Sequence, residues 1–190
     1  MEKGLLIILS GPSGVGKGTV RKYISAKKEI EFEFSISMTT RAPRDNETDG
    51  VEYYFVSKEE FQKRIDEDKF LEHAEFVGNF YGTPKDKVEE LREQGKNVLL
   101  EIEINGASQV IEKTKGDDRV ISFFLMPPSL KKLEERIRSR KSETDDVIAM
   151  RLEKGANEMK VAEMYDYVIT NDRVATAGNK IINLIKQKLK

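Results

Sequence analysis

A glycine-rich segment with the sequence Gly-Pro-Ser-Gly-Val-Gly-Lys-Gly-Thr constrains the fold more than any other feature. It directly follows an apolar run of strand length, Leu5–Leu9, and directly precedes a segment of helical period. Glycines let the backbone turn tightly with its N–H groups pointing inward, where a Cβ would block phosphate oxygens. Lys17 adds a point charge, and the helix N-terminus adds a partial positive charge. The segment therefore predicts a site for the phosphates of ATP, formed by Gly11, Pro12, Ser13, Gly14, Val15, Gly16, Lys17, Gly18 and Thr19.

One position departs from the strict phosphate-loop pattern. Where Ser or Thr usually follows the lysine, this chain has Gly18, and Thr19 comes one residue later. Glycine offers no side-chain oxygen to Mg²⁺, so we expect phosphates, water and a carboxylate elsewhere to hold the metal. A glycine-rich turn without a ligand is the alternative. The coincidence of strand, spacing, lysine and helix disfavours that alternative.

The rest of the chain alternates between apolar runs of strand length and segments of helical period. This alternation is typical of a mostly parallel sheet with helices on both faces. We therefore predict an α/β fold of the P-loop NTPase type. The expected strands are Leu5–Leu9, Phe32–Ser37, Val98–Ile104, Val120–Leu125 and Tyr167–Thr170.

Helix starts are indicated by capping residues. Thr83 is predicted to cap a helix over residues 84–94, and Ser129 a helix that runs to about residue 140. A third, charged helix is expected from near Thr144, and a last amphipathic helix over the C-terminal residues.

Two stretches interrupt the alternation. Residues 37–83 hold short aromatic-rich pieces around one helix, which indicates an inserted subdomain. Residues 130–160 are densely charged with little strand signal, which indicates helices that stand away from the core as a mobile arm. We predict a single domain over residues 1–190, with its core at about 1–35, 87–128 and 155–190, the inserted subdomain at about 36–86 and the arm at about 129–154.

Composition excludes several kinds of chemistry. The 33 Lys and Arg residues nearly balance 34 Asp and Glu residues, so no global field attracts nucleic acid and any anion site has to be local. Without cysteine and with His73 as its single histidine, the chain has no disulfides, no thiolate chemistry and no His-rich metal site. The longest apolar run is too short for a membrane span or a signal peptide. We expect a cytoplasmic protein without nucleic-acid, membrane or obligate protein partners.

Several stretches beyond the phosphate loop closely resemble guanylate kinases. Those similar to the GMP-binding region are Ser-Ile-Ser-Met-Thr-Thr-Arg-Ala-Pro-Arg-Asp-Asn-Glu at 35–47, Asp-Gly-Val-Glu-Tyr-Tyr-Phe-Val at 49–56, Phe-Leu-Glu-His-Ala-Glu at 70–75 and Gly-Asn-Phe-Tyr-Gly-Thr at 78–83. With residues 100–107 and 167–172, the resemblance covers essentially the whole chain in the right order. It implies transfer of the γ-phosphoryl group of ATP to GMP, with Mg²⁺, in purine nucleotide metabolism. We also expect dGMP to be accepted.

The same resemblance implies roles in GMP binding. It places the phosphate of GMP against Ser37, Arg41, Arg44, Tyr53 and Tyr81, and guanine against Ser37, Glu72 and Thr83. Glu47 is also expected in the GMP-binding site. Arginine forks suit bidentate phosphate binding, and tyrosine hydroxyls add neutral donors. A carboxylate such as Glu72 accepts from guanine N1–H and N2–H₂, whereas adenine presents an acceptor at N1. Without the resemblance, we would interpret Glu72 as a glutamate on the surface of a helix.

Two carboxylates, Glu101 and Glu103, follow the third expected strand, where guanylate kinases more often carry Asp. Alternation places both on one face of the strand end, near the phosphate loop. A charge buried there without a cation is costly, which favours contact with water-bound Mg²⁺ or with GMP over a structural role. We expect Glu101 to contact the metal through water. The sequence leaves open which of the two reaches which ligand.

The resemblance makes the charged arm a lid that closes over ATP. Its arginines, Arg136, Arg140 and Arg151, are then catalytic together with Lys17, because they stabilise charge on the transferred group. Solvated helix charge is the alternative for each arginine. Lys141 stands where the family usually has Gly.

Asn171 and Asp172, after the last expected strand, resemble the segment that borders adenine. Two alternatives for the whole chain are a non-catalytic guanylate-kinase-like module that binds proteins and a P-loop kinase of other small phosphorylated substrates. The intact loop and arginine set disfavour the first. The guanine-reading residues disfavour the second.

Overall fold

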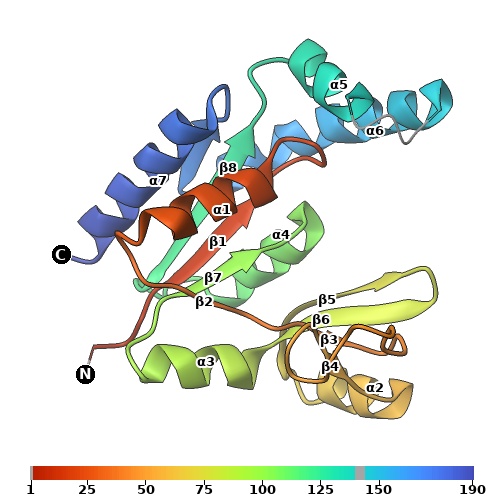
Figure 1. Cartoon of the computed structure of the whole chain (residues 1–190). Helices are drawn as coiled ribbons and strands as arrows, with labels where there is room; N and C mark the ends of the chain where they lie inside the picture. The colour runs from red at the N-terminus through yellow and green to blue at the C-terminus, as the bar shows by residue number, and fades with distance from the viewer. Residues whose placement is uncertain (1, 140–143) are drawn as a thin grey trace.

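Five parallel strands form the central sheet in this computed structural model, which describes residues 2–139 and 144–190. Their order is β2 (Glu33–Phe34), β7 (Val98–Glu101), β1 (Leu6–Ser10), β8 (Val120–Met126) and β9 (Tyr167–Thr170). Helices α1 (Lys17–Lys27) and α7 (Val174–Lys188) cover one face, and α3 (Lys85–Glu93) and α4 (Ile104–Lys113) cover the other (Figure 1). The prediction of a mostly parallel α/β fold is confirmed.

The core lies on both faces of β1. Leu5, Ile7 and Leu9 pack toward α1 and α7, whereas Leu6 and Ile8 pack toward α3 and α4. All five side chains are at most 1% exposed. Because a strand between two helix layers needs apolar side chains at every position, the unbroken run at residues 5–9 indicates a central strand.

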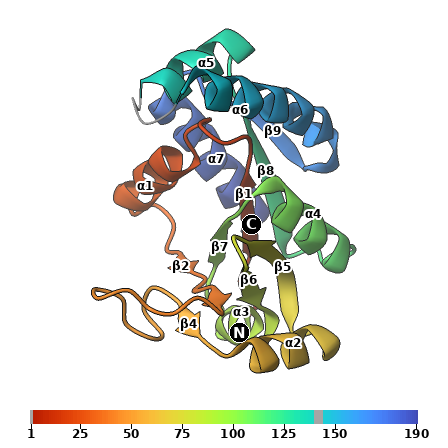
Figure 2. The same cartoon turned by 90° about the vertical axis from the view of Figure 1, so that its right-hand side faces the viewer.

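The inserted segment forms a second sheet with the order β4 (Tyr54–Phe55), β3 (Met38–Thr39), β6 (Asn79–Pro84) and β5 (Phe70–Phe76). Helix α2 (Lys58–Asp66) packs on this sheet through Phe61, which stacks on Phe70 with ring centroids 4.4 Å apart. Both views place this sheet at the opposite end of the molecule from α5 (Leu130–Arg138) and α6 (Asp145–Glu158) (Figure 2).

Helices α5 and α6 rest against the phosphate loop. They pack on each other through Leu133, Ile137 and Ile148, and a 3₁₀ helix, Met159–Met164, follows α6. A Cβ added to Gly14 of the loop would lie 3.0 Å from Cγ1 of Ile137. In this structure the charged helices therefore contact the phosphate loop, while their apolar side chains form a cluster separate from those of the central sheet. The division into core and mobile arm stays a prediction. Ser129 caps α5 as predicted, since its hydroxyl accepts from the Lys132 N–H at 3.1 Å.

Several predicted boundaries are wrong. The strand expected over Phe32–Ser37 ends after Phe34, and the one expected over Val98–Ile104 ends at Glu101, because Ile104 begins α4. Thr83 does not cap α3. It lies in β6, where its backbone pairs with β5, so the helix begins only at Lys85.

Over the described ranges, 2–139 and 144–190, no helix is both long and apolar enough to cross a membrane.

Candidate active site

The phosphate loop connects β1 to α1, and its glycines are required by conformation and by space. Gly11 (φ 147°) and Gly16 (φ 101°) occupy backbone regions that side chains with a Cβ rarely adopt. A Cβ at Gly11 would lie 2.5 Å from the carbonyl oxygen of Leu125, and one at Gly16 would lie 2.8 Å from Nδ2 of Asn171. The loop is thus pressed against the end of β8 and against the segment that follows β9.

Lys17 lies inside this loop. Its side chain is 10% exposed, its Nζ donates to the carbonyl of Gly11 at 2.6 Å, and Glu103 Oε1 is 3.8 Å away. The cavity over the loop is lined by loop residues and by Arg21, Lys22 and the two carboxylates at 101 and 103. A cation and a helix N-terminus therefore face the same polar cavity, which suits an anion with several phosphates.

Asn171 and Arg136 meet at the carbonyl of Val15. Asn171 is buried, and its Nδ2 donates to Val15 O at 2.8 Å. The Arg136 guanidinium donates to Val15 O at 3.2 Å, to Asn171 O at 2.8 Å and to Asp172 O at 3.3 Å. These contacts bring together the loop, the segment after β9 and helix α5, three parts that lie far apart in the sequence.

The two carboxylates near the loop are less buried than the sequence argument assumed. Glu103 stands at the start of α4 with its side chain 64% exposed, and that of Glu101 is 29% exposed. Glu101 also has a cationic partner, Arg21, with Nε and Oε2 2.6 Å apart. The argument from an unpaired buried charge is therefore wrong for both. Sequence reasoning missed Arg21, although its place four residues after Lys17 puts the two on one face of α1.

The position of Gly18 bears on metal binding. A Cβ added there would lie 3.4 Å from Oε1 of Glu101, so this carboxylate reaches the space beside the residue that lacks a hydroxyl. Among the described residues, no three His, Cys, Asp or Glu side chains gather as a metal site. A metal in this cavity would therefore take much of its coordination from phosphates and water.

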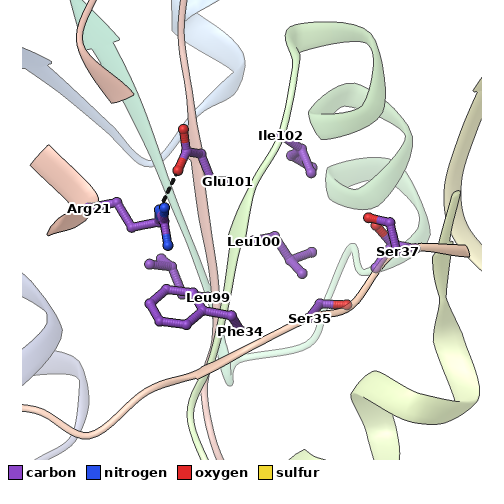
Figure 3. A pocket seen from close by; sticks show the side chains of 9 residues that line it. Arg21, Phe34, Ser35, Ser37, Leu99, Leu100, Glu101 and Ile102 are labelled. Atoms are coloured by element: carbon purple, nitrogen blue, oxygen red, sulfur yellow. Dashed lines mark ion pairs between the residues drawn. The ribbon is translucent and has the colours of Figure 1, made fainter. Parts of the chain in front are cut away.

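A small pocket connects the carboxyl end of β7 with the inserted sheet (Figure 3). Arg21 and Glu101 line it from the side of the phosphate loop, and Phe34 lines it from β2 of the central sheet. Ser37 and Thr83 line it from the inserted segment. Ser37 and Thr83, two residues that the resemblance places against guanine, therefore share this pocket.

Several residues expected at GMP form a cluster around Arg41, namely Glu47, Tyr53 and Tyr81. Its Nη2 donates to both carboxylate oxygens of Glu47 at 2.8 Å, and its guanidinium carbon lies 5.5 Å from the ring centroid of Tyr53. The Tyr53 and Tyr81 rings are 6.0 Å apart. The pKa of Glu47 is lowered, chiefly because the Arg44 backbone N–H donates to it and further because Arg41 is adjacent. A phosphate at Arg41 would have to displace the Glu47 carboxylate or share the guanidinium with it.

Glu72 and Thr83 are cross-strand neighbours in β5 and β6. The Thr83 hydroxyl donates to Oε1 of Glu72 at 2.6 Å. Burial raises the pKa of Glu72, and the hydrogen bonds from Thr83 offset part of this effect. The alternative of a helix-surface glutamate is wrong, since Glu72 lies on a strand and is partly buried.

The structure describes two of the three arginines expected in the lid. Arg136 contacts the loop as described above, and Arg151 lies on α6. Arg140 lies outside the described residues, as does Lys141.

A phosphate loop at the carboxyl end of a parallel sheet, with a second polar site on an inserted sheet, defines a nucleotide kinase of the P-loop class. The family model for guanylate kinase matches residues 3–188. The chain belongs to the guanylate kinase family.

Individual relatives agree with this assignment. The chain is 51% identical to a guanylate kinase from Mesoplasma florum over 98% of its own length and 62% of that protein's length. It is 50% identical to a guanylate kinase from Bacillus subtilis over 95% of its length and 87% of the relative's. The crystal structure of guanylate kinase from Anaplasma phagocytophilum is 34% identical with a TM-score of 0.71, covering 100% of this chain and 88% of that one. These relatives are named as kinases, a class that generally needs a divalent metal with ATP, and none is named as a non-catalytic module.

The raised pKa of Glu72 predicts a pH-dependent stability effect. The folded-state pKa lies above the unfolded value of about 4.3, so the ionised carboxylate disfavours folding at neutral pH. This cost disappears as pH falls below both values. Glu72→Gln, which can still accept from Thr83, should therefore raise the free energy of unfolding of the ligand-free protein at pH 7.5, with the gain vanishing near pH 4. Urea unfolding at both pH values measures it.

The matched control is Glu75→Gln, at the exposed end of the same strand, which should change stability by less than about 0.5 kcal/mol. A loss of stability for Glu72→Gln at pH 7.5 would contradict the expectation.

Proposed function

We propose that the chain transfers the γ-phosphoryl group of ATP to GMP and releases ADP and GDP. The observation that carries this proposal is the Glu72 carboxylate, held by Thr83 on the inserted sheet while a phosphate loop lies on the central sheet. The phosphate loop suits a nucleoside triphosphate, and the Glu72 site suits a base with adjacent hydrogen-bond donors. Membership of the guanylate kinase family supports both assignments.

At the ATP end, the loop N–H groups and the N-terminus of α1 bind the phosphates. Lys17, which donates to loop carbonyls in the structure, turns to the β- and γ-phosphates when they enter. Mg²⁺ fits beside Gly18, where the Glu101 carboxylate approaches, and would be held there through water. Bound with ATP, the metal supplies positive charge to the phosphates. Asn171 and Asp172 border the adenine.

At the GMP end, Arg41, Arg44, Tyr53 and Tyr81 bind the phosphate. Displacement of Glu47 from the Arg41 fork makes two guanidinium N–H groups available to phosphate oxygens. Glu72 accepts from guanine N1–H and N2–H₂, and Ser37 and Thr83 complete the guanine site from the pocket in Figure 3.

In the transfer step, a phosphate oxygen of GMP attacks the γ-phosphorus. The new P–O bond forms as the bond to the β–γ bridging oxygen breaks, and ADP leaves with that oxygen. No covalent enzyme intermediate and no general base are required, since positioning and electrostatics lower the barrier. Lys17 and the lid arginines stabilise the charge on the moving group.

The first test concerns base choice. In the wild type, kcat/KM for GMP should exceed that for AMP by roughly 10⁴-fold, because AMP sets its N1 lone pair against the Glu72 carboxylate. IMP, which keeps N1–H and lacks the amino group, should fall between the two. Glu72→Gln should lower kcat/KM for GMP by roughly 10²-fold, since one acceptor becomes a donor. A coupled ADP-release assay with GMP, AMP and IMP measures these kcat/KM values for the wild type and for Glu72→Gln.

Binding of ATP alone provides the control for this test, because Glu72→Gln leaves the phosphate loop unchanged. Equal efficiencies for GMP and AMP in the wild type would contradict the proposed guanine site.

The second test concerns the phosphate loop. Lys17→Ala should lower kcat by about 10³-fold or more, because it removes the cation that faces the transferred phosphoryl group. The thermal midpoint of the ligand-free protein should change little. Lys27→Ala, in the last turn of the same helix, is the matched control and should retain activity. A folded Lys17→Ala variant with wild-type turnover would refute the role of this lysine.

The third test concerns the lid. Arg151→Ala should lower kcat by roughly 10³-fold while KM for GMP changes little, since its benefit arises when charge moves in the transition state. Arg138→Ala is the control, because Arg138 on α5 is paired with Glu134 and Asp145. Steady-state kinetics for both substrates measure the effect. A change confined to KM would show that Arg151 binds substrate without acting in transfer.

A further inference from the structure

Helix α4 holds the free edge of strand β5. This strand is at the edge of the inserted sheet, with β6 as its strand neighbour. The Gln109 carboxamide on α4 accepts from the backbone N–H of His73 at 3.1 Å and donates to the His73 carbonyl at 3.0 Å. These two hydrogen bonds replace the pairing that a further strand would supply, and they act on the residue next to Glu72. Figure 2 shows helix α4 beside strand β5.

One turn further along α4, a second contact holds the start of the same strand. Lys113 Nζ donates to the carbonyl of Phe70 at 2.7 Å and to Oδ1 of Asp68 at 2.6 Å. The backbone on both sides of Glu72 is therefore attached to one helix of the central domain, and this helix begins directly after the Glu101–Glu103 segment.

The Glu72 carboxylate itself lies against Gly106, in the first turn of α4. A Cβ added to Gly106 would lie 2.8 Å from Oε2 and 3.1 Å from Cδ of Glu72. The oxygen on the other side, Oε1, accepts from Thr83 at 2.6 Å. The carboxylate is therefore confined between a hydroxyl on β6 and a helix surface without a side chain.

We infer that Gly106 and Gln109 are positioning residues for guanine recognition, and that the missing side chain at Gly106 determines where the Glu72 carboxylate lies. The inference rests on the proposed function, because it concerns the same base-reading group. Gly106 leaves the space that the carboxylate occupies, and Gln109 fixes the backbone that carries it. Neither residue contacts the base in this assignment, and both act through Glu72.

Alanine at Gly106 separates this role from a role in stability. Alanine favours a helix interior more than glycine does, so the helix itself should not weaken. The new methyl group meets the end of a flexible side chain, so the carboxylate moves while the backbone stays in place. A displacement of about 1 Å at a recognition group can cost about 10²-fold in efficiency.

The test measures kcat/KM for GMP and AMP and the thermal midpoint of the purified full chain. Gly106→Ala should lower kcat/KM for GMP by about 10²-fold with little change for AMP, and the midpoint should not fall. Gln109→Ala, which adds no atoms, should lower the GMP-to-AMP ratio by about tenfold, because it frees the backbone at His73. Ser108→Ala is the matched control on the same helix, since its hydroxyl bonds to the Ile104 carbonyl, and it should keep the wild-type ratio.

The same variants are then combined with Glu72→Ala. If Gly106 and Gln109 act through the carboxylate, neither substitution should change the ratio by more than about twofold in that background. A full additional loss there would overturn the inference, as would a wild-type ratio in both single variants. If Glu72→Ala loses the preference for GMP over AMP while Gly106→Ala and Gln109→Ala keep it, the inference is contradicted and the proposed guanine site still stands. If Glu72→Ala keeps the wild-type preference for GMP over AMP, both the inference and the proposed guanine site are contradicted.

Discussion

The close approach of the phosphate loop to its neighbours is the constraint on which the site depends. Gly11 lies so near the backbone of β8, and Gly16 so near Asn171, that a Cβ at either position would come within 3 Å of another atom. The loop can be held this tightly because β1, which leads into it, is buried on both faces. The direction of α1 and the place of Lys17 follow from that contact, and α5 then packs on the loop through Ile137 and Arg136.

Three cations at the site have a carboxylate of the protein close to them. Lys17 is near Glu103, Arg21 pairs with Glu101, and Arg41 pairs with Glu47. A chain with a net charge of −1 can therefore build two anion sites, since the positive field at each site is local and is partly neutralised by these carboxylates before substrate binds. Phosphates that enter must compete with those carboxylates. A phosphate can win this competition because several of its oxygens accept hydrogen bonds from the cationic side chains at the same time.

The inserted sheet and the central sheet meet near Glu72, where Leu71 packs into the apolar cluster beneath α3 and α4 and polar contacts hold the strand edge. Helix α4 holds β5 through Gln109 and Lys113, and the small pocket in Figure 3 lies between the two sheets. Guanine recognition is thereby tied to the helix that starts beside the phosphate loop. A movement of α4 relative to β5 would alter the position of Glu72 and the shape of the pocket together.

The α/β class, the central strand and the phosphate loop could all be predicted from the sequence, because burial on both faces and glycine geometry leave a direct pattern in the residue types. The sequence also indicated the second subdomain and the Ser129 cap. It misjudged the ends of short strands, and it wrongly made Thr83 a helix cap, because Pro84 after Thr83 matches a helix start. The actual partner of the Thr83 hydroxyl, Glu72, lies eleven residues away in the chain. Only the tertiary structure decided that Glu101 is paired with Arg21, that Glu47 occupies the Arg41 fork and that Gly106 faces Glu72. Two of these contacts, Arg21 with Glu101 and Gly106 with Glu72, join different elements, and the third closes one loop. Their distances depend on how the chain folds and packs, which no local pattern of residue types records.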